Sequence, residues 1–141
     1  MNYDLDKFVK AQELMYPWAL KEMKNGRKQT HWMWFIFPQL KALGRSNTAL
    51  YYGIKDLEEA KAYLEHPVLG SRLTEISEVL LTLETNDPYG VMGDIDGLKL
   101  CSSMTLFAEA VGYDSVFGKV IDKYYNGNKD MNTIRILQSK E

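Results

Sequence analysis

The sequence predicts an all-α fold, a compact multihelical single domain over residues 1–141 with about six to eight short helices. Three observations predict it. Apolar residues recur every three or four positions along most of the chain, most of these runs end at glycine, asparagine or proline, and almost nothing alternates as a half-buried strand does. With 45% hydrophobic and 26% charged residues, the chain can also bury a core without a disulfide or a metal.

The first helix is predicted in two pieces. Apolar residues from Leu5 to Met15 keep helical spacing behind Asp4, a candidate N-cap. Because proline lacks an amide hydrogen, Pro17 is expected to break this helix or to begin a second piece that runs to Lys24. The Asn-Gly pair that follows supplies a left-handed stop.

Residues 27–43 have no helical period. The run from Trp32 to Phe37 is apolar on every face, and Pro38 disfavours the helical conformation for the residue before it. We therefore expect an irregular or extended aromatic segment that passes through the core, with a short helix as the alternative.

From residue 46 onward, helix caps and helix stops alternate. Ser46 can cap a short helix, and Asp56 with Glu59 forms a capping box for a helix through residue 65. His66 is expected to cap the carbonyl groups at the end of that helix.

The second half of the chain predicts four more helices. One runs from about Ser71 to the turn at residues 86–88, and one from about residue 97 to residue 111 with Asp96 as its cap. Another covers residues 116–125 behind Asp114, and a last short helix follows Asp130.

Charge and cysteine content narrow the class of protein. A net charge of −2 gives no long-range positive field, so nucleic acid is not an expected partner. One cysteine, Cys101, and two histidines exclude a disulfide framework and disfavour a structural metal, and we expect no metal or cofactor.

The sequence also predicts the cellular location of the protein. Acidic residues interrupt the first 20 positions, which excludes a secretory signal peptide. No apolar run approaches the ~18 to 20 residues that a membrane-spanning helix needs. We expect a soluble, cytoplasmic protein without membrane contact, whose oligomeric state the sequence leaves open.

The densest group of candidate ligand contacts lies in residues 27–39. Polar groups flank an aromatic wall there, an arrangement that suits a pocket, although large aromatics are also ordinary core residues. The candidate contacts are Arg27, Lys28, Trp32, Trp34 and Gln39. His31 is the candidate general acid or base, with a buried imidazole hydrogen-bonded to the backbone as the alternative.

Two further groups are candidates for binding an anion. Arg45 and Ser46 stand just before a predicted helix, where backbone N–H groups and a guanidinium can converge; a capped helix with a surface arginine is the alternative. Lys99, Ser102 and Ser103 share neighbouring sides of another helix, and small hydroxyls at a helix crossing would explain the serines equally well.

Five segments together closely resemble the bacterial family catalogued as domain of unknown function 1810. They are residues 26–28 (GRK), 31–39 (HWMWFIFPQ), 43–46 (LGRS), 66–73 (HPVLGSRL) and 99–107 (KLCSSMTLF). The resemblance implies a small, mostly α-helical fold of its own type and implies no established activity. Some members of the family carry the label calpastatin, which we discount because calpastatin is disordered and repetitive whereas this chain is neither.

Two functional hypotheses follow. In the first, the protein binds a small anionic or phosphorylated metabolite, either as a binding protein or as an enzyme: cations neutralise the ligand's charge, Trp32 or Trp34 stacks on a ring and His31 moves a proton. In the second, the protein is a non-enzymatic interaction or regulatory module. Its partner would meet exposed faces of four tyrosines, Tyr51, Tyr52, Tyr124 and Tyr125.

Overall fold

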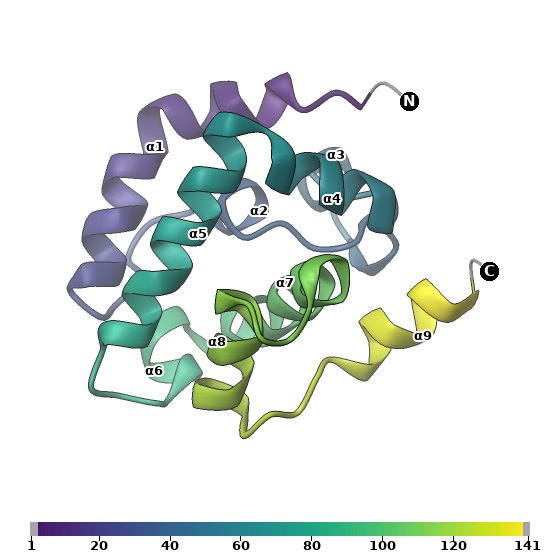
Figure 1. The fold of residues 1–141 in the computed structure, drawn as a ribbon. Coiled ribbons are helices and arrows are strands. Elements are labelled where there is room, and N and C mark those ends of the chain that lie inside the picture. Colours follow the sequence, from purple (N-terminus) through teal and green to yellow (C-terminus); the bar gives the residue numbers. More distant parts are fainter. Residues whose placement is uncertain (1–2, 140–141) are drawn as a thin grey trace.

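The computed structural model describes residues 3–139, and in that part of the chain nine α-helices and one 3-10 helix form an all-α domain (Figure 1). The α-helices are α1 (Asp6–Lys24), α2 (Met33–Ile36), α3 (Asn47–Tyr51), α4 (Leu57–Glu65), α5 (Pro67–Thr82), α6 (Pro88–Met92), α7 (Asp94–Val111), α8 (Val116–Tyr125) and α9 (Met131–Ser139). The 3-10 helix, Lys41–Leu43, precedes α3. The all-α prediction is confirmed, with slightly more helices than expected.

Helix α7 occupies the middle of the fold and packs against α4, α6, α8 and α9 (Figure 1). Helices α1 and α5 lie side by side on its flank. The core between α1, α4 and α7 is aromatic. Phe8 of α1 meets Tyr63 of α4 edge to face with ring centroids 5.2 Å apart, and the ring centroid of Phe107 on α7 lies 5.4 Å from that of Tyr63. The N-terminal halves of α7 and α9 lie next to residues 39–49, which follow α2.

Helix α1 is continuous, so the predicted break at Pro17 is wrong. Packing on α5 holds both sides of the proline: the Tyr16 hydroxyl donates to the carbonyl of Arg72 at 3.1 Å, and Met23 is fully buried. These contacts outweigh the hydrogen bond that Pro17 cannot make. Asp4 is not the cap either, because the N-cap position is Leu5, which offers no side-chain acceptor.

Several predicted caps also differ. His66 is the C-cap residue of α4, and its backbone N–H donates to the carbonyls of Ala62 at 3.0 Å and Tyr63 at 3.2 Å. Its imidazole instead caps the next helix: Nδ1 accepts the N–H groups of Val68 at 3.2 Å and Leu69 at 3.3 Å and so begins α5. That helix therefore starts at Pro67, earlier than expected, because proline is well suited to a first helical position. Ser115, not Asp114, caps α8.

The turn predicted at residues 86–88 leads into a helix that the sequence reading missed. Asp87 caps α6 by accepting the N–H of Tyr89 at 3.0 Å. Helix α7 then follows directly and begins at Asp94, with Gly93 at φ 93° between the two helices. Asp96 lies inside the first turn of α7 and does not cap it. The predicted caps Ser46 and Asp56 are confirmed.

Residues 27–43 are irregular, as expected, and include the short helix α2 that was the alternative. The segment runs through the core, where Trp32 and Phe37 are almost fully buried. Its chain direction is fixed near its end by a parallel bridge between Leu40 and Ile54, the one β pairing within residues 3–139.

Two buried polar side chains of α1 satisfy this segment's polar groups. The Glu22 carboxylate accepts the N–H of Gln29 at 2.8 Å, the N–H and hydroxyl of Thr30 at 3.1 and 2.7 Å, and the indole N–H of Trp32 at 2.9 Å. Gln12 donates to the carbonyl of Phe35 at 2.7 Å. An irregular segment lacks a helix's own hydrogen bonds, so α1 supplies the partners that allow it to be buried.

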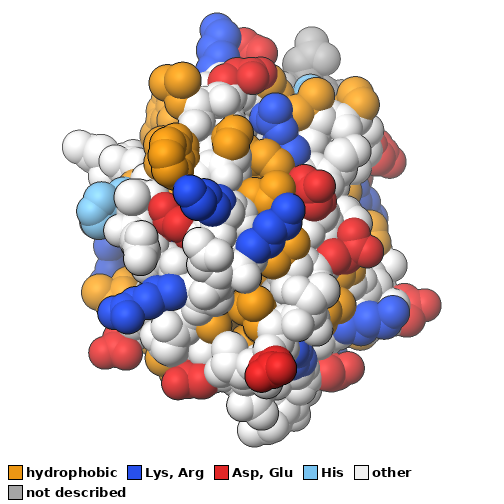
Figure 2. All heavy atoms as spheres, turned by 90° about the vertical axis from the view of Figure 1, so that its left-hand side faces the viewer, with side chains coloured by type: hydrophobic (Ala, Val, Ile, Leu, Met, Phe, Trp, Pro, Cys, Tyr) orange, Lys and Arg blue, Asp and Glu red, His pale blue; other side chains and the backbone are white. Residues whose placement is uncertain are grey.

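Surface charges are mixed on the face shown in Figure 2, where basic and acidic side chains are interspersed and form no continuous basic stripe. No helix within residues 3–139 is long and apolar enough to cross a membrane. In the same part of the chain no three His, Cys, Asp or Glu side chains gather as metal ligands would.

Candidate functional site

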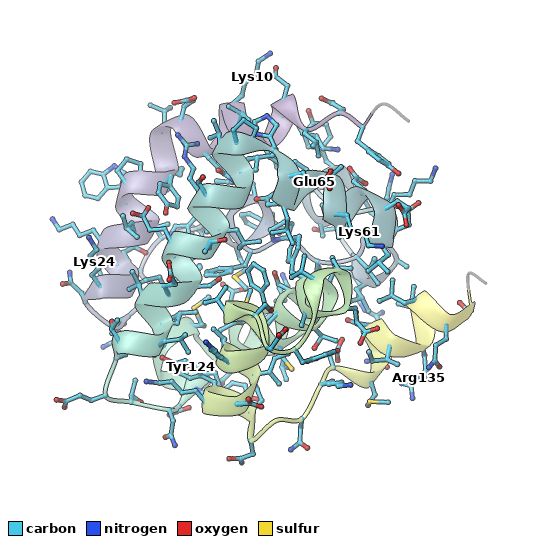
Figure 3. The ribbon with its side chains drawn as sticks, in the orientation of Figure 1. Lys10, Lys24, Lys61, Glu65, Tyr124 and Arg135 are labelled. Atoms are coloured by element: carbon cyan, nitrogen blue, oxygen red, sulfur yellow. The ribbon has the colours of Figure 1, made fainter. Side chains whose placement is uncertain are left out.

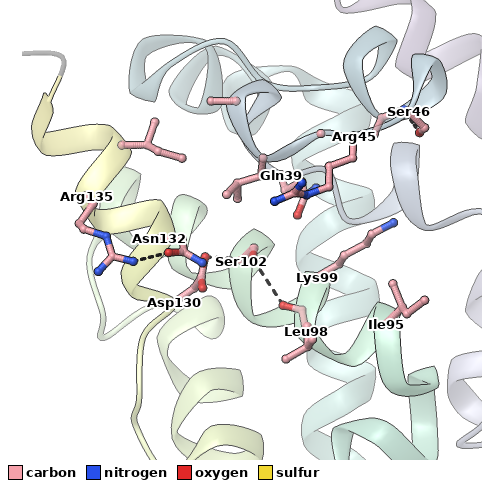
Figure 4. Close-up of a pocket in the computed structure, with 15 residues that line it drawn as sticks. Gln39, Arg45, Ser46, Ile95, Leu98, Lys99, Ser102, Asp130, Asn132 and Arg135 are labelled. Atoms are coloured by element: carbon pink, nitrogen blue, oxygen red, sulfur yellow. Dashed lines mark hydrogen bonds between the residues drawn. The ribbon is translucent and has the colours of Figure 1, made fainter.

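A hollow of about 880 Å³ lies between α7, α9 and residues 39–49. In Figure 4, Gln39 and Arg45 form one wall and Arg135 of α9 lies across from them, with Ser102 of α7 between the two. Lys99, also on α7, lies on the other side of Arg45 from Arg135. We call this space the cationic hollow. Its remaining lining residues are Ala42, Leu43, Gly44, Ser46, Ala49, Ile95, Leu98, Asp130, Asn132 and Ile136.

Three cations line this hollow without a partner carboxylate. Within residues 3–139, no Asp or Glu oxygen comes within 4.0 Å of a charged nitrogen of Arg45, Lys99 or Arg135. Within the described part of the chain, the Arg135 guanidinium donates one hydrogen bond, to the neutral side-chain oxygen of Asn132 (Figure 4). Among its described lining residues the hollow therefore carries more positive than negative charge, with Asp130 as its carboxylate.

The one carboxylate of the hollow is engaged locally. Asp130 Oδ2 accepts the hydroxyl of Ser102 at 3.0 Å, the N–H of Thr133 at 3.1 Å and its hydroxyl at 2.5 Å. It thus caps α9 and ties that helix to α7. The Ser102 hydroxyl has two acceptors within reach, Asp130 and the Leu98 carbonyl at 3.4 Å (Figure 4).

Residues 41–53 carry the wall that holds Arg45. The two strands of chain at its base are joined by hydrogen bonds from Lys41 N–H to the Ile54 carbonyl at 2.7 Å and from Ile54 N–H to the Gln39 carbonyl at 2.9 Å. Ser46 caps the following helix by accepting the N–H of Ala49 at 3.1 Å. Because α3 has only five residues, the arginine and not a helix dipole is the main positive charge there.

A second hollow of about 450 Å³, the aromatic hollow, adjoins the first. Its lining comprises Lys28, His31, Trp32, Met33, Trp34, Met92, Gly93, Asp94, Ile95, Asp96 and Lys99. Ile95 and Lys99 line both hollows, and a narrow crevice beside Trp34 and Gln39 also reaches Lys99. The two hollows are therefore compartments of one surface site that meet at α7.

Most of the predicted site residues come together here, in two groups. Gln39, Arg45, Ser46, Lys99 and Ser102 line the cationic hollow, and Lys28, His31, Trp32, Trp34 and Lys99 line the aromatic one. Two do not. Arg27 is exposed and lines neither hollow, and Ser103 is fully buried in the core, where its hydroxyl has no hydrogen-bond partner among residues 3–139.

The side chains of Lys28 and Trp32 already make contacts within the protein. Lys28 Nζ lies 3.0 Å from Asp96, donates to the Thr30 carbonyl at 2.6 Å and sits 5.1 Å from the Trp32 ring centroid. Trp32 has no exposed surface. Trp34 is only partly buried, so it is the tryptophan that can stack on a ligand. His31 is exposed, so the buried alternative is wrong.

Sequence reasoning missed three contributors: Glu22, Asp130 as part of the site, and Arg135. Arg135 belongs to a short C-terminal helix whose pattern gives no sign of what it faces. Burial opposes ionisation of Glu22, yet the hydrogen bonds from Gln29, Thr30 and Trp32 outweigh it and lower the pKa of this carboxyl to about 2. Glu22 is thus a buried anion that holds residues next to the aromatic hollow in place through hydrogen bonds.

The tyrosines of the interaction hypothesis are not all exposed. Tyr124 is buried, and its hydroxyl donates to the Leu80 carbonyl of α5 at 2.5 Å (Figure 3). Tyr125 donates to the Gly97 carbonyl. Only Tyr51 presents most of its side chain, with 57% exposed, so these four residues do not form one surface patch.

Comparisons with known proteins agree with this architecture. A family model described as protein of unknown function (DUF1810) matches residues 2–137. The chain belongs to that family. A crystal structure of the conserved hypothetical protein Rv1873 from Mycobacterium tuberculosis shares 46% identity and superimposes with a TM-score of 0.94. The match covers 96% of this chain and 97% of the other, so the DUF1810 chain has the same fold over nearly its whole length. No curated protein matches it.

Proposed function

We propose that this protein binds a small anionic or phosphorylated metabolite, whose charged group lies in the cationic hollow between Arg45, Lys99 and Arg135. The observation that carries the proposal is the absence of partner carboxylates from these three cations within residues 3–139. Three like charges around one hollow repel each other, and a bound anion relieves that repulsion.

Neutral groups around the cations support the same proposal. The Gln39 side chain forms no hydrogen bond within the described residues, and its amide faces the hollow beside Arg45 (Figure 4). A planar guanidinium binds carboxylate or phosphate through two parallel N–H donors, and a nearby amide adds a donor that fixes the orientation. This combination suits a compact oxyanion better than an extended polyanion.

An enzymatic role would rest on His31. Its exposed imidazole lines the aromatic hollow, where it could donate a proton to a ligand held by Lys99 or accept a proton from it. The proposal itself requires only binding, and catalysis is a further step that His31→Gln would remove while leaving the affinity for the anion in place.

A thermal-shift screen tests the proposal with nucleotides, sugar phosphates and dicarboxylates. A ligand at 100 times its dissociation constant stabilises a fold by about 2.7 kcal/mol, which is readily detected. We expect stabilisation of the wild type that is lost in Arg45→Ala and in Lys99→Ala but kept in Arg27→Ala, since Arg27 is an exposed arginine outside the site. The stabilisation should also fall as salt is added.

Two results would contradict the proposal. One is the absence of a shift with every anion. The other is a shift that Arg27→Ala reduces as much as Arg45→Ala does, because this would indicate nonspecific attraction to surface charge. Either result would favour the interaction module, and capture of a protein partner would then be the next experiment.

A further inference from the structure

We infer that the ligand is a nucleotide, with its phosphate in the cationic hollow and its base against Trp34 in the aromatic hollow. The inference rests on the proposed function and adds the class of molecule. It follows from the way the two hollows differ in charge while sharing Ile95 and Lys99.

The charges of the two hollows fix the orientation of the ligand. The cationic hollow holds Arg45, Arg135 and Lys99 against one carboxylate, Asp130, whereas in the aromatic hollow Asp94 and Asp96 offset Lys28 and Lys99. These last two carboxylates repel a second anion and instead accept hydrogen bonds from amino or hydroxyl groups. Lys28 neutralises Asp96 at 3.0 Å, but Asp94 is exposed and has no cation within 4.0 Å among the described residues.

The ring-binding surface is Trp34. It is partly buried, lines the aromatic hollow and the adjoining crevice, and has Lys99 Nζ at 6.0 Å from its ring centroid. Lys99 therefore lies where the base of a bound nucleotide meets its phosphate, within reach of both. An indole face stacks on any base, because every base offers a π-face.

An apolar edge connects the two hollows. Ile95 and Leu98 occupy successive turns of α7 beside the cationic hollow and are 70% and 61% exposed. Large aliphatic side chains held this far into solvent are covered when a sugar or base lies over them. Inorganic phosphate would bind only in the cationic hollow and would leave both Ile95 and Trp34 uncovered.

The experiment compares dissociation constants, measured by titration calorimetry, for the four ribonucleoside monophosphates, ribose phosphate, inorganic phosphate and adenosine. We expect at least one nucleotide to bind about tenfold more tightly than ribose phosphate, in line with the energy of one base stacked on an aromatic side chain. Trp34→Leu should bring that nucleotide to within about threefold of ribose phosphate, whose own affinity should not change. Trp18→Leu, which removes an exposed tryptophan outside both hollows, should change neither value.

A second variant guards against misfolding of Trp34→Leu. Asp94→Ala alters an exposed residue and should weaken nucleotide binding about threefold, the effect of one lost hydrogen bond, without affecting ribose phosphate. Equal affinities for nucleotides and ribose phosphate, or a nucleotide preference that survives both substitutions, would overturn the inference while the proposed anion site stands. Adenosine bound as tightly as its monophosphate would overturn it as well. No binding of any anion would overturn both proposals.

Discussion

The indole N–H of Trp32 donates a hydrogen bond of 2.9 Å to the carboxylate of Glu22. Because Glu22 also accepts bonds from Gln29 and Thr30, one buried charge on α1 holds the start of the aromatic segment in place. The geometry of the aromatic hollow thus depends on a residue that does not line it.

Replacing this charge tests its structural weight. Glu22→Gln keeps the shape of the side chain but turns one acceptor oxygen into a donor facing other donors. We expect the free energy of unfolding to fall by about 1–3 kcal/mol, as for a buried hydrogen-bonded group that loses its partners. Urea denaturation would measure it, and Glu78→Gln, an exposed change on α5, should be close to neutral. Equal stability of the two variants would show that Glu22 is dispensable.

The same residue should make stability depend on pH. Because the pKa of Glu22 is lowered from 4.5 to about 2 in the folded protein, the unfolded chain binds the proton first as pH falls. The stabilisation by Glu22 is complete above pH 4.5 and is lost between pH 4.5 and about 2. The stability difference between wild type and Glu22→Gln should shrink across that interval; a difference that stays constant would contradict this assignment.

Cys101 should react slowly in the folded protein. Burial is the main cause that raises the pKa of its thiol to about 11, and the Sγ atom donates to the Asn128 carbonyl at 3.5 Å. At pH 8, iodoacetamide should label it about a hundredfold more slowly than in the urea-unfolded chain, since only the thiolate reacts. Mass spectrometry of timed samples gives both rates, and similar rates would mean that the thiol is not shielded.

His66 should contribute through its cap rather than through charge. His66→Leu removes the acceptor for the N–H groups of Val68 and Leu69 and is expected to lower stability by about 1 kcal/mol. His66→Asn supplies another acceptor at the N-cap and should restore most of the loss. If both variants unfold at the same temperature, the cap is not what His66 provides.

Gly70 should tolerate no side chain. A Cβ atom there would lie 2.0 Å from the carbonyl oxygen of Leu64, at the corner where α4 meets α5. We expect Gly70→Ala to destabilise the fold by at least about 1–3 kcal/mol, as overpacking does. Gly90→Ala is the control, since its nearest neighbour is a movable side-chain oxygen of Asp87 at 3.1 Å. Thermal unfolding compares them: alanine favours a helix more than glycine does, so Gly90→Ala should be neutral or stabilising, and a Gly70→Ala protein as stable as Gly90→Ala would show that the contact with Leu64 is relieved without cost.

The sequence predicted those parts of the fold whose signals are local. The spacing of Leu73, Ile76 and Leu80 and the caps Ser46 and Asp56 depend on neighbouring residues, so they could be read directly. Pro17 could not, because its helix survives through contacts with residues more than fifty positions away. The same limit hid the pairing of Asp96 with Lys28, which lies far from it in the sequence.

The candidate site was predictable in composition but not in arrangement. Residue chemistry singled out Arg45, Lys99 and Trp34, which line adjoining hollows. It also included Arg27 and Ser103, because nearness in sequence to the other candidates said nothing about which way each side chain would point. Arg135 was missed for the opposite reason, as it reaches the hollow from a helix that is distant in the sequence.

The pairing of Leu40 with Ile54 separates the wall of the proposed binding site from the stability of the core. It closes residues 41–53 at their base, and Gly53 packs so tightly there that a Cβ atom would lie 2.4 Å from the Cα atom of Lys41. Lengthening a loop that is already closed raises its entropic cost slowly, by about 0.6 kcal/mol for each doubling. Residues 41–53, which carry Arg45, can therefore be replaced by other loop sequences, and the proposed anion specificity could change without a change to the core.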